Sequence, residues 1–323
     1  DVCSSDLTDT QNEVFKTPVN KIRLFEHGAP GSQNLKLTRK YYTEDMPDGR
    51  VKHIVQNITD PDIVPYIPDG IGNGTDRQRI PAVLIIPGGA FRRLVYNFEG
   101  EDVAKWLNSM GIAAFVLECR LPSDEHDNAE DVPLIDTMRA MRVIRGRAQE
   151  FGIDEAKIGV MGFSAGGFMA ALLSTAYESD VYADYKYKDE YDKLSARPDF
   201  AVCSYPVISI DDCIEAGKRY MSEEQVLERI SDSKAKILHK YNPDKLVRPD
   251  MPPVFICETD DDRTTLSENS VGFYMAARKA GVSAELHIFR TGGHGYGCGD
   301  DFAQTGEWKV LFTKWIKSIG IIS

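Results

Sequence analysis

Residues 157–173 read Lys-Ile-Gly-Val-Met-Gly-Phe-Ser-Ala-Gly-Gly-Phe-Met-Ala-Ala-Leu-Leu, and this stretch of the 323-residue chain decides the fold. Its apolar start, 157–161, is typical of a strand, and its end, 168–173, is typical of a helix. Between them Ser164 lies on a tight turn, where Gly162 and Gly166 provide space. The helix that follows points its first N–H groups at developing negative charge. The pattern predicts a nucleophile elbow at Ser164, and a glycine-rich turn that only packs a helix on a sheet is the alternative.

Strand-like and helical runs alternate on both sides of this turn. Strands are predicted at 81–86, 112–118, 200–205, 254–257 and 284–289, and helices at 99–110, 132–151, 266–280 and 305–319. Two further β-like stretches, 35–42 and 53–58, come first. Alternating strands and helices form a mostly parallel sheet that is covered on both faces. We therefore predict an α/β fold with a mostly parallel, eight-stranded sheet.

The length suits one large domain with insertions. The chain begins Asp-Val-Cys-Ser-Ser-Asp-Leu, which resembles a translated sequencing adapter, so residues 1–10 are expected to be a scar or a disordered start. The domain is expected over 11–323. Residues 211–250 are polar and helical without an apolar strand, which predicts an insertion over the carboxyl edge of the sheet. Such an insertion would shape a substrate pocket, and a surface excursion without a role is the alternative.

Composition limits the classes of partner. The net charge of −12 argues against nucleic acid and anionic membranes, which repel an acidic surface. No run approaches the roughly 20 apolar residues of a membrane helix. Zinc-like cysteine spacing is missing, and Cys119, Cys203 and Cys257 lie in apolar runs that favour buried free thiols. Oligomeric state stays open, and so does the compartment, because a native leader could have been lost.

A serine nucleophile needs a base and an acid. In folds with this elbow the acid and then the histidine follow the serine. Of the three histidines after Ser164, His239 lies in the predicted insertion and His287 inside a strand, whereas His294 lies in a glycine-rich loop just past a strand. We predict His294 as the base. The acid is expected after the strand at 254–257, where spacing alone leaves three candidates open: Asp260, Asp261 and Asp262.

The negative charge that forms on an ester carbonyl oxygen needs hydrogen-bond donors. Residues 85–91, Ile-Ile-Pro-Gly-Gly-Ala-Phe, end a strand in small residues whose N–H groups can point inward. We predict an oxyanion hole formed by the backbone amides of Gly89, Ala90 and Ala165. A plain tight turn is the alternative for this loop.

With these residues in place, the sequence from about residue 54 onward resembles the α/β-hydrolase serine esterases, and more narrowly the bacterial acetyl esterase and acetylxylan esterase group, related to bacterial feruloyl esterases. The resemblance rests on the elbow and on the stretches 87–91, 99–107, 120–122, 195–200, 205–208, 252–255, 261–270 and 284–295. It implies a serine carboxylesterase that removes short acyl groups, above all acetyl, from carbohydrate esters such as acetylated xylan. It implies no cofactor, and it makes Asp261 the triad acid.

Three departures from the family pattern concern the site. Ala90 stands where a third glycine is usual, Thr265-Leu266 stands where Val-Pro is common, and Arg92 and Arg93 replace small or polar residues. Arg92 is expected to contact substrate, together with two aromatic residues next to the predicted loops, Phe91 and Phe163. Solvated arginines are the alternative.

Other activities fit the same residues. A feruloyl or general short-chain carboxylesterase would use the same triad. A peptidase of the prolyl-oligopeptidase type shares the order of serine, acid and histidine, although such enzymes favour tyrosine where Ala165 stands. A binding module that has lost its catalysis is the non-enzymatic alternative, and the intact triad candidates argue against it.

Overall fold

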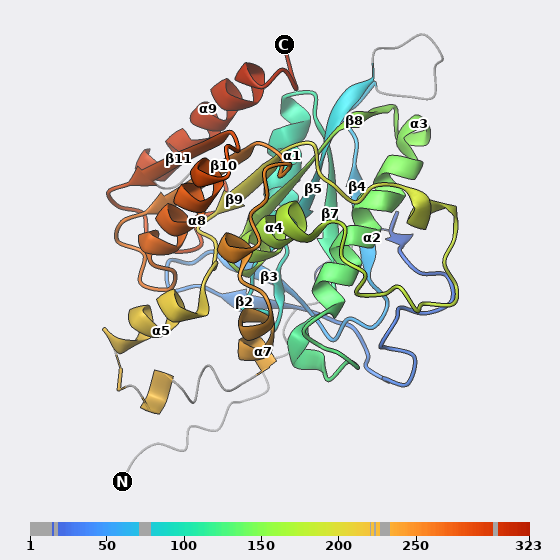
Figure 1. The fold of residues 1–323 in the computed structure, drawn as a ribbon, viewed down its shortest axis with the longest axis horizontal. Coiled ribbons are helices and arrows are strands. Elements are labelled where there is room, and N and C mark those ends of the chain that lie inside the picture. Colours follow the sequence, from blue (N-terminus) through green and yellow to red (C-terminus); the bar gives the residue numbers. More distant parts are fainter. Residues whose placement is uncertain are drawn as a thin grey trace.

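The computed structural model describes residues 15, 19–70, 79–219, 221–222, 224–226, 233–299 and 303–323. Within these ranges an eight-stranded sheet forms the centre, in the order β1-β4-β7-β5-β8-β9-β10-β11 (Figure 1). Its strands are β1 (Ile22–Arg23), β4 (Asp62–Tyr66), β5 (Ile80–Ile86), β7 (Ala113–Glu118), β8 (Ile153–Phe163), β9 (Ala201–Ser204), β10 (Val254–Thr259) and β11 (Ala284–Phe289). The strands from β7 to β11 pair in parallel, and β4 and β1 add two antiparallel pairings. The predicted mostly parallel sheet is confirmed.

The central strands are apolar because both of their faces are covered. Every residue of β7 and β10 is buried, and so is all of β5 after its first residue. Parallel strands that carry helices on both faces have such continuous apolar runs in place of alternation. The same burial accounts for Cys119, Cys203 and Cys257, which are buried free thiols as predicted.

Helices cover the two faces of the sheet as two layers. On one face lie α1 (Asp102–Ser109) and α9 (Ala303–Ser318), joined by the rings of Trp106 and Trp308, whose centroids are 5.0 Å apart. The other face is covered by α2 (Val132–Gly146), α4 (Ala165–Ala176) and α8 (Ser267–Lys279), with the short α3 (Ala148–Phe151) following α2 (Figure 1). The helix predicted at 132–151 is therefore split into α2 and α3, and the one predicted at 99–110 begins as a π-helical turn, η1 (Asn97–Glu101).

A second sheet lies beside the main one and was not predicted. It has three described strands, β2 (Lys40–Asp45), β3 (Val51–Gln56) and β6 (Leu94–Val95), all antiparallel. A two-residue strand such as β6 carries no periodicity that a sequence could reveal. Its position matters for the site, because β6 follows the loop after β5 directly and ties that loop to β3.

The predicted insertion is partly described. It contains α5 (Ile210–Lys218), α7 (Ser233–Lys240) and the short helix η4 (Pro243–Lys245), whereas residues 220, 223 and 227–232 lie outside the described ranges, as do residues 1–14. Lys240 and Tyr241 bind the carboxylate of Asp131 at 2.7 and 2.5 Å. Asp131 belongs to the connection that follows β7, so the end of α7 lies at the carboxyl edge of the sheet.

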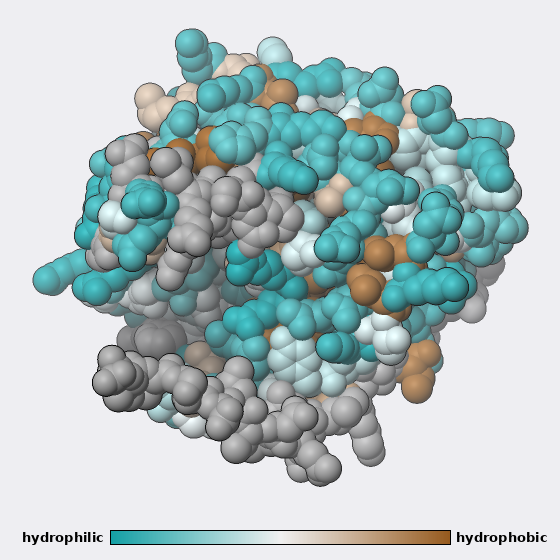
Figure 2. Space-filling model, turned by 90° about the horizontal axis from the view of Figure 1, so that it is seen from below, coloured by the Kyte–Doolittle hydropathy of each residue, from teal (hydrophilic) through white to brown (hydrophobic). Residues whose placement is uncertain are grey.

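The face of the molecule shown in Figure 2 is mostly hydrophilic. Seen from below the view of Figure 1, the described residues are mostly hydrophilic, and the apolar ones form small, separate patches (Figure 2). Among the residues that the structure describes, no helix is both long enough and apolar enough to cross a bilayer.

Candidate active site

Loops at the carboxyl ends of neighbouring parallel strands bring distant residues together. Ser164 follows β8, Asp262 follows β10 and His294 follows β11, and the loop from Pro87 to Arg93 follows β5. In the order β5-β8-β9-β10-β11 these strands are adjacent. The carboxyl edge of such a sheet is where α/β folds place their ligands.

The backbone at Ser164 is held in a strained turn. Ser164 has φ 54° and ψ −117°, a conformation that residues other than glycine rarely adopt. The two flanking glycines are required by close approach: a Cβ atom on Gly162 would lie 1.9 Å from the carbonyl oxygen of Gly166, and one on Gly166 would lie 2.0 Å from that of Ile86. This geometry is a nucleophile elbow, and it directs the serine hydroxyl away from the sheet.

His294 reaches the serine across 130 residues of sequence. Its Nε2 atom lies 2.8 Å from Ser164 Oγ, and its Nδ1 atom lies 2.6 Å from Asp262 Oδ2. Because an ionised carboxylate only accepts hydrogen bonds, Nδ1 carries the proton and Nε2 is free to accept the serine proton. The ring of Tyr205 packs edge-on against the imidazole, with centroids 5.0 Å apart. The structure therefore brings Ser164 and His294 together as the sequence predicts.

The acid in contact with this histidine is Asp262, so the prediction of Asp261 is wrong. Asp261 is exposed, and its carboxylate accepts a hydrogen bond from the backbone N–H of Gly293 at 2.8 Å. Asp262 is 4% exposed and faces the imidazole. Successive residues in this turn point in different directions, and only one of the consecutive aspartates can face inward.

Asp262 is surrounded by donors. Its Oδ1 atom accepts the backbone N–H groups of Thr264 and Thr265 at 2.7 and 2.9 Å, and its Oδ2 atom accepts the Thr265 hydroxyl at 3.0 Å. Burial acts to raise the pKa of this carboxyl group, but the hydrogen bonds from His294 and from these two amides outweigh it, and the pKa is lowered. Asp262 therefore stays ionised and orients the imidazole.

The loop after β5 has a backbone conformation that leaves N–H groups available to donate hydrogen bonds to a substrate. Gly89, Ala90 and Phe91 have φ angles of 138°, 58° and 60°. The Gly88 carbonyl accepts Val95 N–H at 2.9 Å, which fixes the loop to the start of β6. In the part of the chain that the structure describes, none of the turn and loop hydrogen bonds uses the N–H groups of Gly89 or Ala90. Ala165 begins α4, where the first N–H groups of a helix have no partner within it.

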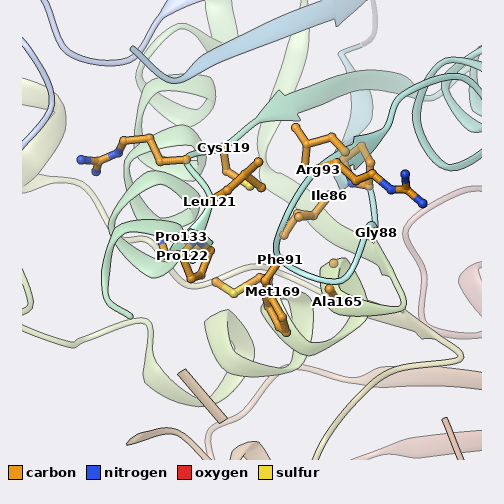
Figure 3. A pocket seen from close by; sticks show the side chains of 14 residues that line it. Ile86, Gly88, Phe91, Arg93, Cys119, Leu121, Pro122, Pro133, Ala165 and Met169 are labelled. Atoms are coloured by element: carbon orange, nitrogen blue, oxygen red, sulfur yellow. The ribbon is translucent and has the colours of Figure 1, made fainter. Parts of the chain in front are cut away.

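A small apolar cavity with a free volume of about 10 Å³ lies between this loop and the start of α4 (Figure 3). Phe91 and Met169 converge near Ala165, and the cavity wall also contains the apolar side chains of Ile86, Pro87, Leu94, Leu121, Pro122 and Pro133. Phe91 thus lines this cavity, and its contact with substrate stays a prediction.

The two other predicted contacts do not line this cavity. Phe163 is fully buried against Tyr205 and Trp308, with ring centroids 5.8 and 6.3 Å away, so its predicted contact with substrate is wrong. It points inward because β8 continues to it in register, beneath the serine. Arg92 is exposed and lies outside the cavity wall, which its neighbour Arg93 joins.

Two curated proteins are similar to this chain in sequence. Acetylxylan esterase from Xylanibacter ruminicola is 31% identical over 240 residues, which cover 74% of this chain and 45% of that protein. Endo-1,4-beta-xylanase B from Butyrivibrio fibrisolvens is 31% identical over 227 residues, which cover 70% of this chain and 34% of that protein. The chain thus spans less than half the length of these curated relatives.

A solved structure matches nearly the whole chain. It is the acetyl ester-xyloside bifunctional hydrolase from Caldicellulosiruptor lactoaceticus, with a TM-score of 0.70, 34% identity and coverage of 94% of this chain and 97% of that one. The match confirms the predicted α/β-hydrolase fold. The BD-FAE family model matches residues 71–276, and the chain belongs to that family of α/β-hydrolase esterases.

Proposed function

We propose that this protein is a serine carboxylesterase that removes short acyl groups, above all acetyl, from carbohydrate esters such as acetylated xylo-oligosaccharides. The observation that carries the proposal is the chain of hydrogen bonds from Ser164 Oγ through His294 to Asp262, at 2.8 and 2.6 Å. This series of hydrogen bonds can activate the serine hydroxyl without a cofactor.

The first half of the reaction forms an acyl-enzyme. Ser164 Oγ attacks the ester carbonyl carbon while its proton passes to His294 Nε2, and the imidazolium is stabilised by the Asp262 carboxylate. The tetrahedral intermediate then collapses: the bond to the sugar oxygen breaks, and His294 returns the proton to that oxygen. The acyl group remains on Ser164. In the second half water replaces the sugar hydroxyl, gives its proton to His294, and releases the free acid and the serine.

The carbonyl oxygen becomes negative in both halves. The N–H groups of Gly89, Ala90 and Ala165 are the donors proposed for it, and their lack of other acceptors in the described loops supports this role. Each such donor contributes about 3 to 4 kcal/mol in the transition state. The N-terminus of α4, a 12-residue helix, adds a positive partial charge at the same place.

The proposed preference for short acyl groups rests on the cavity. Its free volume of about 10 Å³ is roughly the space of one water molecule, far below that of pockets that enclose drug-sized ligands. Its wall beside Ala165 is apolar and includes Phe91 and Met169. The names of the relatives, an acetylxylan esterase and an acetyl ester-xyloside hydrolase, support an acetylated sugar as the substrate.

Two measurements test the proposal. Ser164→Ala should reduce the hydrolysis of p-nitrophenyl acetate by several orders of magnitude and abolish labelling by a fluorophosphonate, while the circular dichroism spectrum stays unchanged. Acetate release from acetylated xylo-oligosaccharides should exceed the hydrolysis of butyryl and feruloyl esters, and Phe91→Ala should narrow that difference because it deepens the cavity. Unchanged activity in Ser164→Ala would refute the mechanism. If the wild type cleaved aminoacyl-proline anilides faster than it cleaves esters, the substrate would be a peptide and not an ester.

A further inference from the structure

A second carboxylate, Glu99, lies behind the site and takes no part in the mechanism above. It belongs to η1, is 4% exposed, and joins two of the site's components. Its Oε2 atom accepts the backbone N–H of Gly88 at 2.8 Å, in the loop that carries the proposed oxyanion donors. Its Oε1 atom accepts the hydroxyl of Tyr205 at 2.9 Å. The approach is close, because a Cβ atom on Gly88 would lie 2.6 Å from Oε2.

Tyr205 carries this contact to the histidine. Its hydroxyl oxygen accepts the N–H of Gly297 at 3.1 Å, three residues after His294, and its ring packs against the imidazole. Its backbone carbonyl oxygen lies 3.3 Å from the Thr265 hydroxyl oxygen. Glu99 and Tyr205 therefore connect the loop after β5 to the loops that hold the acid and the histidine.

The partners of Glu99 fit its ionised form. Both groups that the structure places on its oxygens, Gly88 N–H and Tyr205 O–H, donate hydrogen bonds, so a proton on the carboxyl group would face a donor. Burial raises the pKa of Glu99 overall, and the nearby His294, the Tyr205 hydroxyl and the Gly88 amide offset part of that rise. Lys52 on β3 acts in the same direction as His294.

We propose that Glu99 is a positioning residue of the esterase site, which holds the oxyanion loop through Gly88 and adds a second negative charge that favours the His294 imidazolium. The proposal rests on the proposed function. Asp262 faces the imidazole from the loop after β10, Tyr205 from the loop after β9, and Glu99 acts from η1. Since the imidazolium forms when Ser164 attacks, a buried negative charge near it stabilises the transition state more than the resting state.

The test compares Glu99→Gln with a matched control on the same helical turn, Glu101→Gln. Glu101 forms an ion pair with Lys105 of α1 at 2.7 Å. Glu99→Gln should lower kcat by about tenfold or more with KM changed less than about threefold, because the interaction acts mainly in the transition state. It should also shift the acidic limb of the kcat/KM profile to lower pH by about half a unit or more, because the variant no longer places this negative charge near the imidazolium. Glu101→Gln should behave as the wild type.

A purely structural role would not move the acidic limb. A folded Glu99→Gln with wild-type kcat and an unmoved limb would overturn the proposal. If Glu99→Gln does not fold, Glu99→Asp takes its place, because it keeps the charge but shortens the reach to Gly88. In Glu99→Asp kcat should fall while the acidic limb of kcat/KM stays in place. An acidic limb that moves to lower pH in this variant would contradict the proposed role of the charge. Ser164→Ala separates the two proposals. A fully active Ser164→Ala would refute the esterase mechanism itself. An inactive Ser164→Ala together with a Glu99→Gln that behaves as the wild type would refute only the role of Glu99.

Discussion

The choice between Asp261 and Asp262 can be tested directly, because only one of these neighbouring carboxylates contacts the His294 imidazole. Asp262 accepts the imidazole Nδ1–H at 2.6 Å with its side chain 0% exposed, whereas Asp261 is exposed and accepts the backbone N–H of Gly293 in the histidine loop. Asp262→Asn removes the charge and presents an amide to Nδ1. The imidazole then favours the tautomer that carries its proton on Nε2, and it can no longer accept the proton of Ser164.

The expected loss follows from the contact. Two unit charges about 4 Å apart attract by about 4 kcal/mol at an effective dielectric constant of 20, and this attraction to the imidazolium is lost. The wrong tautomer adds to it, which brings the total to about 5 kcal/mol, or about 10⁴-fold in kcat, as for the same change in other serine triads. Asp261→Asn keeps an oxygen that can accept the Gly293 N–H, and its kcat should stay within about twofold of the wild type.

Initial rates on p-nitrophenyl acetate across a range of pH values measure both variants, and thermal unfolding checks that each is folded. A larger loss in Asp261→Asn than in Asp262→Asn would refute the assignment of the acid. A folded Asp262→Asn that retains more than about a tenth of the activity would show that the hydrogen bond to Nδ1 contributes little.

Three further predictions concern other parts of the molecule. Thr265→Val removes a hydroxyl donor 3.0 Å from Asp262, so the carboxylate should hold the imidazolium more tightly and the acidic limb of kcat/KM should move to higher pH. Thr265→Ser keeps the hydroxyl and should keep the wild-type profile. An acidic limb that does not move in Thr265→Val would contradict this prediction. Gly162→Ala places a methyl group 1.9 Å from a carbonyl oxygen and should cost about 3 kcal/mol or more in urea unfolding, so wild-type stability would mean that the turn can relax. Buried His126 has its pKa lowered to about 4 by burial and by Arg120. As pH falls below about 6.5, the unfolded chain binds a proton on His126 that the folded protein does not yet bind. Between pH 7 and 5 the free energy of unfolding should therefore drop by about 2 kcal/mol more in the wild type than in His126→Asn. An equal drop in both proteins would show that His126 does not cause this pH dependence.

The local pattern around Ser164 predicted the elbow because its requirements are local. A strand, a turn that needs glycine on both sides and a helix all lie within 17 residues, and each has its own signal. The same holds for the apolar strands of the main sheet and for His294, which lies in a loop rich in glycine. By contrast, β6 is two residues long, and its pairing with β3 depends on residues some 40 positions earlier.

What only the tertiary structure decided is where side chains point and what lies behind them. Phe163 stands next to the serine in sequence, but the strand directs it into the core between Tyr205 and Trp308. Glu99 looks like one more charged residue at the start of a helix, and only the folded chain buries it against Gly88 and Tyr205.

The acidic run shows the same division. Composition and spacing determined that an aspartate would follow β10, because three stand there in a row. The sequence could not choose among them, since identical residues give identical local signals. The turn that closes between Thr259 and Thr265 made the choice, because its amides and the imidazole of His294 converge on Asp262 alone and leave Asp261 in solvent.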